Sequence, residues 1–414
     1  MKKWMSILMA VVMLCGLLAG CGSSDGKKSD IAAETEGNTA EAVADSDIKV
    51  GFIFIGDEND GYTYAFYKGV QEMQKEYGLT DDQISIKWNV GENEDCYEAA
   101  CDLADEGCNI IFANSFGHED YMMQAAEQYP DVEFCHATGN QAAESGLDNM
   151  HNYYVAVEES RYVSGVVAGY KLNEMIADGT ITEDEAVIGY VGAYAYAQVI
   201  SGYDAFYLGV KSVCPSATMK VKYTGSWGDQ SAEYDVAKAL IEEENCVIIS
   251  QHSNTTGPAS ACEELGAYVV GYNISMTDTA PNAALTSASL DWGPYMSYAV
   301  GCVLNGESID ADWCKGYPDG ACMITDINKN AFSEETYSEL TTKVDEVEKA
   351  LTDDTMEVFD ISTFTVDGKQ LDESYEDSKG NKPIWDGAYH ESYFFSAPDV
   401  TFIVDGITEL NQVV

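Results

Sequence analysis

Aromatic and polar side chains gather in short segments of this 414-residue chain, each placed after an apolar run: 56–62, 114–120, 137–140, 193–197, 225–230, 251–256, 273–278 and 291–295. Flat aromatic faces beside carboxylate, amide and imidazole groups suit a small planar ring with polar edges. Stacking such a ring on one aromatic side chain stabilises by about 1–3 kcal/mol, and carboxylates or amides recognise ring N–H and carbonyl groups. The candidate binding residues are Asp60, Tyr62, Phe66, Phe116, Gly117, Tyr194, Tyr196, Trp227, His252, Asn273 and Trp292.

These residues also have structural alternatives. Tyr62 and Phe66 could be core aromatics at the start of a helix, and Trp227 could cap a domain. Asp60 could satisfy a helix N-terminus, where carboxylates are favoured. Arg161, the only arginine, is expected to pair with a neighbouring acid. With so little arginine, a carboxylate or phosphate ligand is disfavoured, because such groups bind best to a guanidinium fork.

The sequence carries no recognisable catalytic or metal signature. Phosphate-loop and Gly-x-Ser-x-Gly motifs are absent, and His390-Glu391 has no second histidine at metalloprotease spacing. Asp57-x-Asn59 begins like a calcium loop, but Lys68 stands where that loop needs Glu. No Cys-x₂-Cys pair indicates zinc. We therefore expect a binding protein without metal or cofactor, rather than an enzyme.

Composition limits the partners. The chain has 71 acidic and 21 basic residues and a formal net charge of −50, so phosphate-rich nucleic acid would be repelled. With 46% hydrophobic residues it has enough apolar material for a core, and its length suggests about two domains.

Apolar runs alternate with helical patterns along the body of the chain. Strands are predicted at 48–55, 84–90, 109–113, 132–137 and 152–157, and again at 186–192, 219–224, 246–250, 268–272 and 284–289. Repeated strand–helix units predict an α/β fold with two parallel sheets, flanked by helices and divided near residue 157. Helices are expected at 158–177, 291–305 and 331–351, and the last sixty residues read as strands and loops. Ligands of open α/β sheets bind at the carboxyl ends of strands, where the aromatic segments stand.

The N-terminus is predicted to be an export signal. Two lysines precede an apolar run over 4–18, which ends in Leu18-Ala19-Gly20-Cys21. This resembles a bacterial lipoprotein signal, with residues 1–20 removed and Cys21 carrying the lipid. The alternative is an ordinary secretory signal. Residues 21–47 are small, polar and acidic, and predict a flexible tether.

Ten cysteines lie in the body of the chain. An extracytoplasmic location permits disulfides, and Cys314 and Cys322 could close a loop. Cys96 and Cys101 point to different sides of a predicted helix and are poorly placed to bridge. The other body cysteines read mostly as small core residues, and the disulfide state stays open.

Several motifs occur together in an order that identifies a family. They are Gly61-Tyr62-Thr63-Tyr64-Ala65, Ser115-Phe116-Gly117-His118-Glu119-Asp120, Tyr129-Pro130-Asp131-Val132, His136-Ala137-Thr138-Gly139, Arg161-Tyr162-Val163-Ser164-Gly165, Ser226-Trp227-Gly228-Asp229, Gln251-His252, Gly271-Tyr272-Asn273, Leu285-Thr286-Ser287 and Asp291-Trp292-Gly293-Pro294-Tyr295. Over about 48–306 the chain resembles the basic-membrane-protein family of lipoproteins, also called purine-nucleoside-receptor-like.

The resemblance implies a two-lobed type I periplasmic binding protein that delivers a purine nucleoside or nucleobase to the permease and ATPase subunits of an ABC importer. Tyr62 stands where the family has Trp or Phe against the ring, while Phe116, Asn273 and Trp292 keep the family's residues. The chain departs from the family at Phe66, which replaces a His, and at 193–196, which replaces Phe-Pro-Ile-Pro.

On this basis we expect one lobe from 48–157 and 273–305, a second from 158–272 and about 306–370, and a C-terminal extension over 371–414. Crossings between lobes are expected near 157–160 and 272–275 and after about 305, and these would act as a hinge that closes on the ligand. The protein would lie on the extracytoplasmic face of the membrane, anchored through Cys21. The alternatives are a surface sensor or adhesin with the same fold, or a binder of another small solute such as a sugar.

Overall fold

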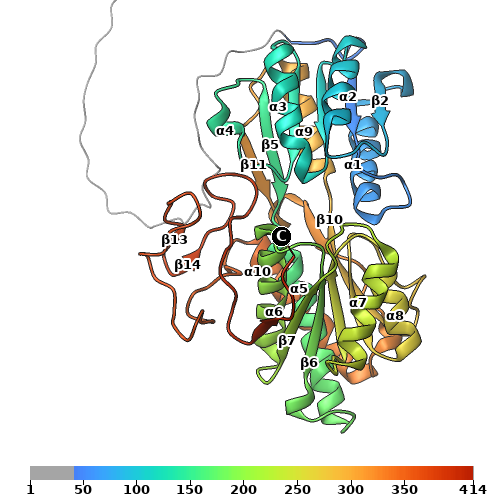
Figure 1. Cartoon of the computed structure of the whole chain (residues 1–414), viewed down its shortest axis with the longest axis vertical. Helices are drawn as coiled ribbons and strands as arrows, with labels where there is room; N and C mark the ends of the chain where they lie inside the picture. Colours follow the sequence, from blue (N-terminus) through green and yellow to red (C-terminus); the bar gives the residue numbers. More distant parts are fainter. Residues whose placement is uncertain (1–41, 414) are drawn as a thin grey trace, which may run out of the picture. The chain divides into compact units, whose positions relative to one another are not determined.

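The structure, a computed structural model, describes residues 42–413, which contain two large sheets with helices on both faces (Figure 1). We call the six-stranded sheet with its helices the first lobe and the seven-stranded sheet with its helices the second lobe. The six-stranded sheet has the order β11-β5-β4-β3-β1-β2, and all its neighbours are parallel. Its strands are β1 (Val50–Ile53), β2 (Ile84–Lys87), β3 (Ile110–Ala113), β4 (Glu133–Ala137), β5 (Met150–Val155) and β11 (Asp312–Lys315).

The seven-stranded sheet has the order β12-β10-β9-β8-β6-β7-β15, in which β12 is antiparallel and the other pairs are parallel. Its strands are β6 (Val187–Gly192), β7 (Thr218–Tyr223), β8 (Ile248–His252), β9 (Tyr268–Tyr272), β10 (Ala284–Leu290), β12 (Cys322–Ile324) and β15 (Ile407–Glu409). A short antiparallel pair, β13 (Ile384–Trp385) and β14 (Ala388–Tyr389), stands apart from both sheets. The prediction of two parallel-sheet regions is confirmed.

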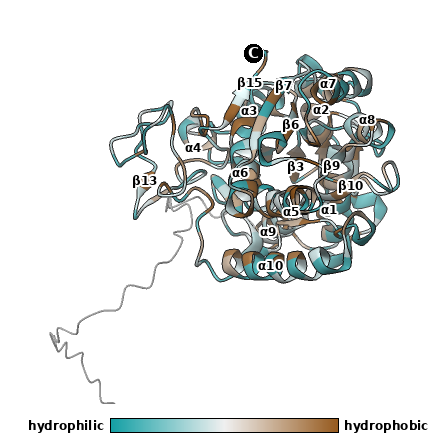
Figure 2. Cartoon of the chain, turned by 90° about the horizontal axis from the view of Figure 1, so that it is seen from below, coloured by the Kyte–Doolittle hydropathy of each residue, from teal (hydrophilic) through white to brown (hydrophobic). Residues whose placement is uncertain are grey.

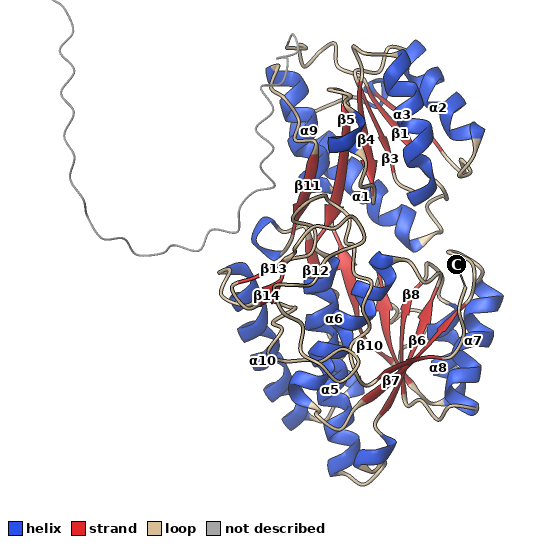
Figure 3. Ribbon diagram, turned by 60° about the vertical axis from the view of Figure 1, so that its left-hand side comes forward, coloured by secondary structure: helices blue, strands red, loops and turns tan. Residues whose placement is uncertain are grey.

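Helices cover both faces of each sheet (Figure 3). In the first lobe, α1 (Gly61–Tyr77) and α9 (Gly293–Asn305) pack on one face. On its other face lie α2 (Glu94–Asp105) and α3 (Glu119–Gln128), and α4 (Ala142–Ser145) follows β4. In the second lobe, α5 (Val157–Ala177), α6 (Ala197–Val213) and α10 (Glu334–Thr352) cover one face, and α7 (Gln230–Glu242) and α8 (Gly257–Leu265) cover the other.

Local sequence explains these elements. All four residues of β1 are buried, as expected for a parallel strand covered on both sides. Helix α1 begins at Asp60, whose carboxylate accepts a hydrogen bond from the Thr63 amide at 2.7 Å, and it ends at Gly78 in the left-handed conformation. Hydrophobic residues concentrate in the central strands and hydrophilic ones on the outer faces of the helices (Figure 2).

Two strands lie in the opposite sheet from the expected one. The predicted first-lobe strand at 284–289 is β10, which pairs with β9 in the second sheet. In contrast, β11 comes from the segment assigned to the second lobe, but it pairs with β5 in the first sheet. The chain therefore passes between the sheets at 155–157, at 290–293 and between β11 and β12, and not at 272–275. Strand periodicity shows that a strand exists but not which neighbour it pairs with, which explains the difference.

The termini of the chain differ in how much is described. The predicted signal at 1–20, Cys21 and most of the tether lie outside residues 42–413. At the end of the predicted tether, the Val43 amide donates a hydrogen bond to the Val303 carbonyl at 3.3 Å. The C-terminal extension adds β15 to the edge of the second sheet, next to β7. Its residues Val400, Phe402 and Val404 are buried in the second-lobe core.

Three further features of residues 42–413 bear on function. None of their helices combines the length and apolar character that a bilayer crossing requires. Their ten cysteines are free thiols, so Cys314 and Cys322 do not close a loop. In the same range, no group of three His, Cys, Asp or Glu side chains is arranged to hold a metal ion.

Candidate ligand-binding site

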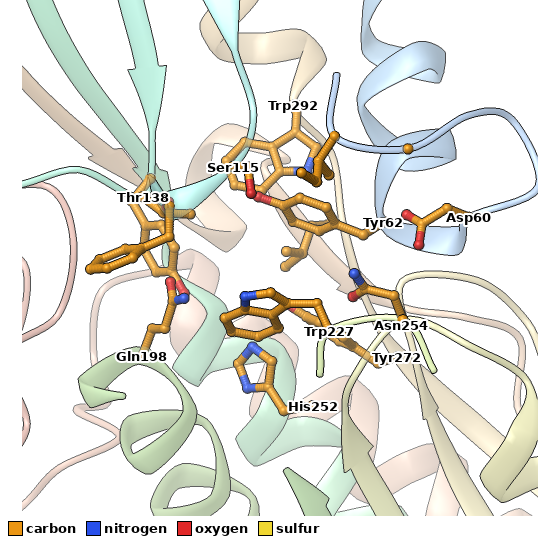
Figure 4. A pocket seen from close by; sticks show the side chains of 16 residues that line it. Asp60, Tyr62, Ser115, Thr138, Gln198, Trp227, His252, Asn254, Tyr272 and Trp292 are labelled. Carbon is orange, nitrogen blue, oxygen red and sulfur yellow. The ribbon is translucent and has the colours of Figure 1, made fainter. Parts of the chain in front are cut away.

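A cavity of about 260 Å³ lies where the carboxyl ends of strands from both sheets face each other. Its volume lies just below the usual range for small-molecule sites, about 300–1,000 Å³. The loops after β1, β3 and β4 line one side, and the loops after β7 and β8 line the other (Figure 4). The lining residues are Ile55, Gly56, Asp60, Tyr62, Ser115, Phe116, Thr138, Tyr154, Gln198, Trp227, Gly228, His252, Asn254, Tyr272, Leu290 and Trp292.

The first-lobe wall is a packed group of aromatic rings. The Tyr62 ring meets the Trp292 ring edge-on at 6.3 Å, and its hydroxyl donates a hydrogen bond to the Asn114 carbonyl at 2.6 Å. Phe66 stacks on Trp292 at 4.1 Å between ring centroids and is fully buried. Phe66 therefore supports the wall from behind and does not line the cavity, in contrast to its predicted contact with ligand.

The second-lobe wall carries Trp227, whose ring lies opposite Tyr62 across the cavity (Figure 4). Tyr194 and Tyr196 stack on each other at 5.1 Å and pack beside Trp227 at 5.5 and 6.1 Å, but neither lines the cavity. Tyr196 meets Phe116 of the first lobe, with ring centroids 5.3 Å apart. The two tyrosines therefore support the Trp227 ring. Tyr196 also links its own second-lobe loop to the first-lobe loop that contains Phe116.

Polar groups stand at the ends of the cavity. Asp60 and Asn254 are at one end, and Thr138 and Gln198 at the other (Figure 4). Burial raises the pKa of Asp60, although its hydrogen bond from Thr63 acts in the opposite direction. Because one Asp60 oxygen caps α1, the second oxygen can accept from a ring N–H.

His252 lines the cavity beneath the Trp227 ring (Figure 4), and Arg161 lies close to His252. Burial, and then the nearby guanidinium, lower the pKa of His252 well below its usual value, so the ring is neutral at physiological pH. Arg161 was expected to pair with an acid, but it has no acidic partner among residues 42–413. It donates a hydrogen bond to the Gln251 carbonyl at 2.8 Å and lies 3.9 Å above the Tyr272 ring. The guanidinium thus holds β8 and β9 together behind the cavity.

Two predicted site residues hold loops in place. The Gly117 amide donates to the Glu92 carboxylate at 2.8 Å, and a Cβ at this position would lie 2.8 Å from that side chain. Asn273 adopts a positive φ of 63° and joins β9 to β10, because its amide donates to the Ala288 carbonyl and its carbonyl accepts from Ser289. Neither residue lines the cavity.

Two buried glutamates hold pocket loops in the two lobes. In the first lobe, Glu119 accepts hydrogen bonds from the amides of Asn140 and Gln141, both at 2.9 Å. Just before them, Thr138 has a φ of 71°, which is strained for a β-branched residue by about 1–3 kcal/mol. In the second lobe, Glu233 accepts from the Ser253 hydroxyl at 2.8 Å, and burial raises its pKa to about 7.

Part of the cavity lining is not among the residues predicted from the sequence. Ser115, Thr138 and Asn254 lie in the polar segments that follow predicted strands. Their position after a strand therefore indicated a place in the binding site. Tyr154, Tyr272 and Leu290 come from strands, and Gln198 from the first turn of α6. Their alternation and spacing match those of ordinary core residues, and only the approach of the two lobes exposes them to one cavity.

Two parallel-sheet lobes that enclose a ligand-sized cavity between their strand ends are typical of solute-binding proteins of the periplasmic kind. An ABC transporter solute-binding protein from Conexibacter woesei has this fold, with a TM-score of 0.58 at 19% identity over 75% of this chain and 97% of the other. Residues 48–352 match the PnrA-like substrate-binding proteins of ABC transporters, and the chain belongs to this family. This confirms the resemblance identified from the motifs.

Named relatives support the same class. A purine-binding protein of Brucella abortus is 35% identical over 64% of this chain and 71% of its own length. A putative ABC transporter glucose-binding protein of Haloferax volcanii is 28% identical over 77% of this chain and 75% of its own length. The family is one of solute-binding proteins rather than enzymes, and such proteins work on the extracytoplasmic side of the membrane.

Proposed function

We propose that this protein captures a purine nucleobase or nucleoside and delivers it to the permease and ATPase subunits of an ABC importer. The observation that carries the proposal is the pair of aromatic side chains, Tyr62 and Trp227, that face each other across the cavity from different lobes. A planar ring between them gains two stacking contacts of about 1–3 kcal/mol each. The purine-binding relative supports this ligand class.

The mechanism is closure of one lobe over the other. The ligand ring first stacks on Tyr62 in the first lobe. Tyr62 packs on Trp292, and Trp292 is in turn held by stacking on Phe66. The second lobe then brings Trp227 onto the opposite face, and Asp60, Asn254 and Gln198 bind polar atoms at the ring edge. We further propose that Cys21 carries a lipid that keeps the protein at the extracytoplasmic face of the membrane.

Calorimetric titration of the protein lacking residues 1–21 tests the ligand class. Adenine, hypoxanthine, adenosine and guanosine are the purine ligands, and glucose and alanine are the comparison solutes. We expect binding of at least one purine and none of the comparison solutes. Glucose binding without purine binding would contradict the purine proposal and favour the sugar alternative, which the Haloferax relative raises.

Variants test the two-sided stack. Tyr62→Ala and Trp227→Ala should each weaken binding of the purine by roughly 5- to 150-fold, which corresponds to one lost stack. Tyr64→Ala is the matched control, since Tyr64 lies on the same helix turn but is 41% exposed and does not line the cavity. Unchanged affinity in both cavity variants would exclude this pocket as the binding site.

A further inference from the structure

The C-terminal extension makes contacts with both lobes beside the points where the chain passes between them. Figures 1 and 3 both place β13 and β14 at the level where the two lobes meet. This part of the chain lies beyond residues 48–352, which match the family. We call residues 379–396 the strap.

The strap is anchored in the second lobe through its middle and through the residues that follow it. Ile384 and Tyr389 within it, and Val400 and Phe402 after it, are buried in the second-lobe core. The Glu391 carboxylate accepts a hydrogen bond from the Ser201 hydroxyl on α6. After the strap, the Val404 amide donates to the buried Asp204 carboxylate at 3.2 Å.

At its two ends the strap contacts the first lobe. The buried Ser396 amide donates to the Asp312 carboxylate of β11 at 2.8 Å, and its hydroxyl donates to the Gly139 carbonyl at 3.0 Å. The Lys379 ammonium donates to the Asn140 carbonyl at 2.8 Å and lies 3.3 Å from Glu144. Lys379 also lies 4.5 Å from the ring centre of Phe395, next to Ser396.

These first-lobe contacts lead directly to the candidate pocket. Gly139 and Asn140 follow Thr138, which lines the cavity in a left-handed conformation. The same loop is fixed from the other side by Glu119. The strap therefore holds the back of a pocket loop that belongs to the first lobe, while its middle and the residues that follow it are fixed in the second lobe.

The strap also meets the hinge itself. The carboxyl groups of Glu391 and Glu158 adjoin, and Glu158 is the second residue of α5, just after the crossing at 155–157. Asp312 begins β11, which leads to the third crossing. A rotation of the lobes about these crossings moves Ser396 relative to Asp312 or Ser201 relative to Glu391, because each pair joins a strap residue to one lobe.

We propose that the strap is a non-covalent tie between the lobes that limits opening of the cleft and positions the Thr138 loop. Ser396 and Lys379 are its positioning residues on the first lobe. The inference rests on the hinge closure proposed above, but it concerns the ligand-free protein as well. Loosening the strap increases the population of open molecules, so bound ligand escapes faster.

The test compares Ser396→Ala and Lys379→Met with the unaltered protein lacking residues 1–21. Small-angle X-ray scattering without ligand measures lobe opening, and stopped-flow dissociation of adenosine measures release. We expect a larger radius of gyration and several-fold faster dissociation in both variants. Ser374→Ala is the control and should change neither value, because among residues 42–413 the Ser374 hydroxyl bonds only to Asp372, which also belongs to the extension.

The readouts separate this inference from the proposed function. If adenosine does not bind, the scattering comparison still decides whether the strap restrains the lobes. Lys379→Met removes surface contacts and keeps the buried hydrogen bond from the Ser396 hydroxyl to the Gly139 carbonyl, so it remains informative if Ser396→Ala does not fold, as judged by far-UV circular dichroism. An unchanged radius of gyration in the folded variants would overturn the proposal.

Discussion

The two walls of the candidate pocket are built in different ways. On the first-lobe side, Trp292 is fully buried, and Phe66 and Tyr153 pack against its ring, so the wall is continuous with the core. On the second-lobe side, Trp227 is half-buried and is supported mainly by the loop tyrosines Tyr194 and Tyr196. The difference indicates that the first lobe supplies a preformed surface for stacking and the second lobe supplies the cover.

Replacing each of the two tryptophans by alanine should give the largest difference in stability between the two walls. Trp292→Ala should lower the free energy of unfolding by about 3–5 kcal/mol, because a fully buried indole leaves a large cavity in the core. Trp227→Ala should cost much less stability and act mainly on binding. Urea denaturation of both variants gives the comparison. Equal losses of stability would show that both walls belong to the core.

The buried glutamate behind the second-lobe wall should make the stability of the protein depend on pH. Burial raises the pKa of Glu233 behind the second-lobe wall to about 7, whereas an unfolded glutamate titrates near 4.5. Between these two pH values the Glu233 carboxyl is deprotonated in the unfolded chain but still protonated in the folded protein. The contribution of Glu233 to stability therefore falls as pH rises from about 4.5 to about 7. By linkage, this loss is on the order of 3 kcal/mol.

Glu233→Gln isolates this contribution from the effect of the large net charge. Glu233 faces Ser253 and Thr255, with Asp60 as the nearby charged group, and these stay unchanged in the variant. Denaturant unfolding of both proteins at several pH values between 4 and 8 gives the free energy of unfolding of each as a function of pH. The difference between the two proteins should change between about pH 4.5 and pH 7 and stay constant above pH 7. Parallel curves would mean that Glu233 is not the titrating group.

A smaller change sharpens the description of the first-lobe wall. Tyr62→Phe keeps the stacking ring and removes the hydroxyl that donates to the Asn114 carbonyl. We expect a loss of about 1 kcal/mol in stability and a change in ligand affinity of less than tenfold, measured by thermal unfolding and titration. A loss of binding as large as that of Tyr62→Ala would show that the hydroxyl, and not the ring, makes the main contribution.

Much of the fold could be predicted from local patterns. The continuous apolar runs at β1 and β3 indicated buried parallel strands, and segments after strands contained Asp60, Tyr62, Phe116, Trp227, His252 and Trp292, all of which line the cavity. The prediction failed where an aromatic ring could point either toward the ligand or into the core, as with Phe66. Nothing in the helical spacing of Phe66 distinguishes a ring facing a ligand from one packed behind Trp292.

The sequence by itself determined the α/β class, the alternation of elements and the family, because these depend on periodicity and on ordered motifs within single segments. Only the tertiary structure decided which sheet takes β10 and β11, that Arg161 lies on the Tyr272 ring, and that the extension touches both lobes. These features depend on contacts between residues far apart in the chain, and such contacts leave no periodic pattern in either partner.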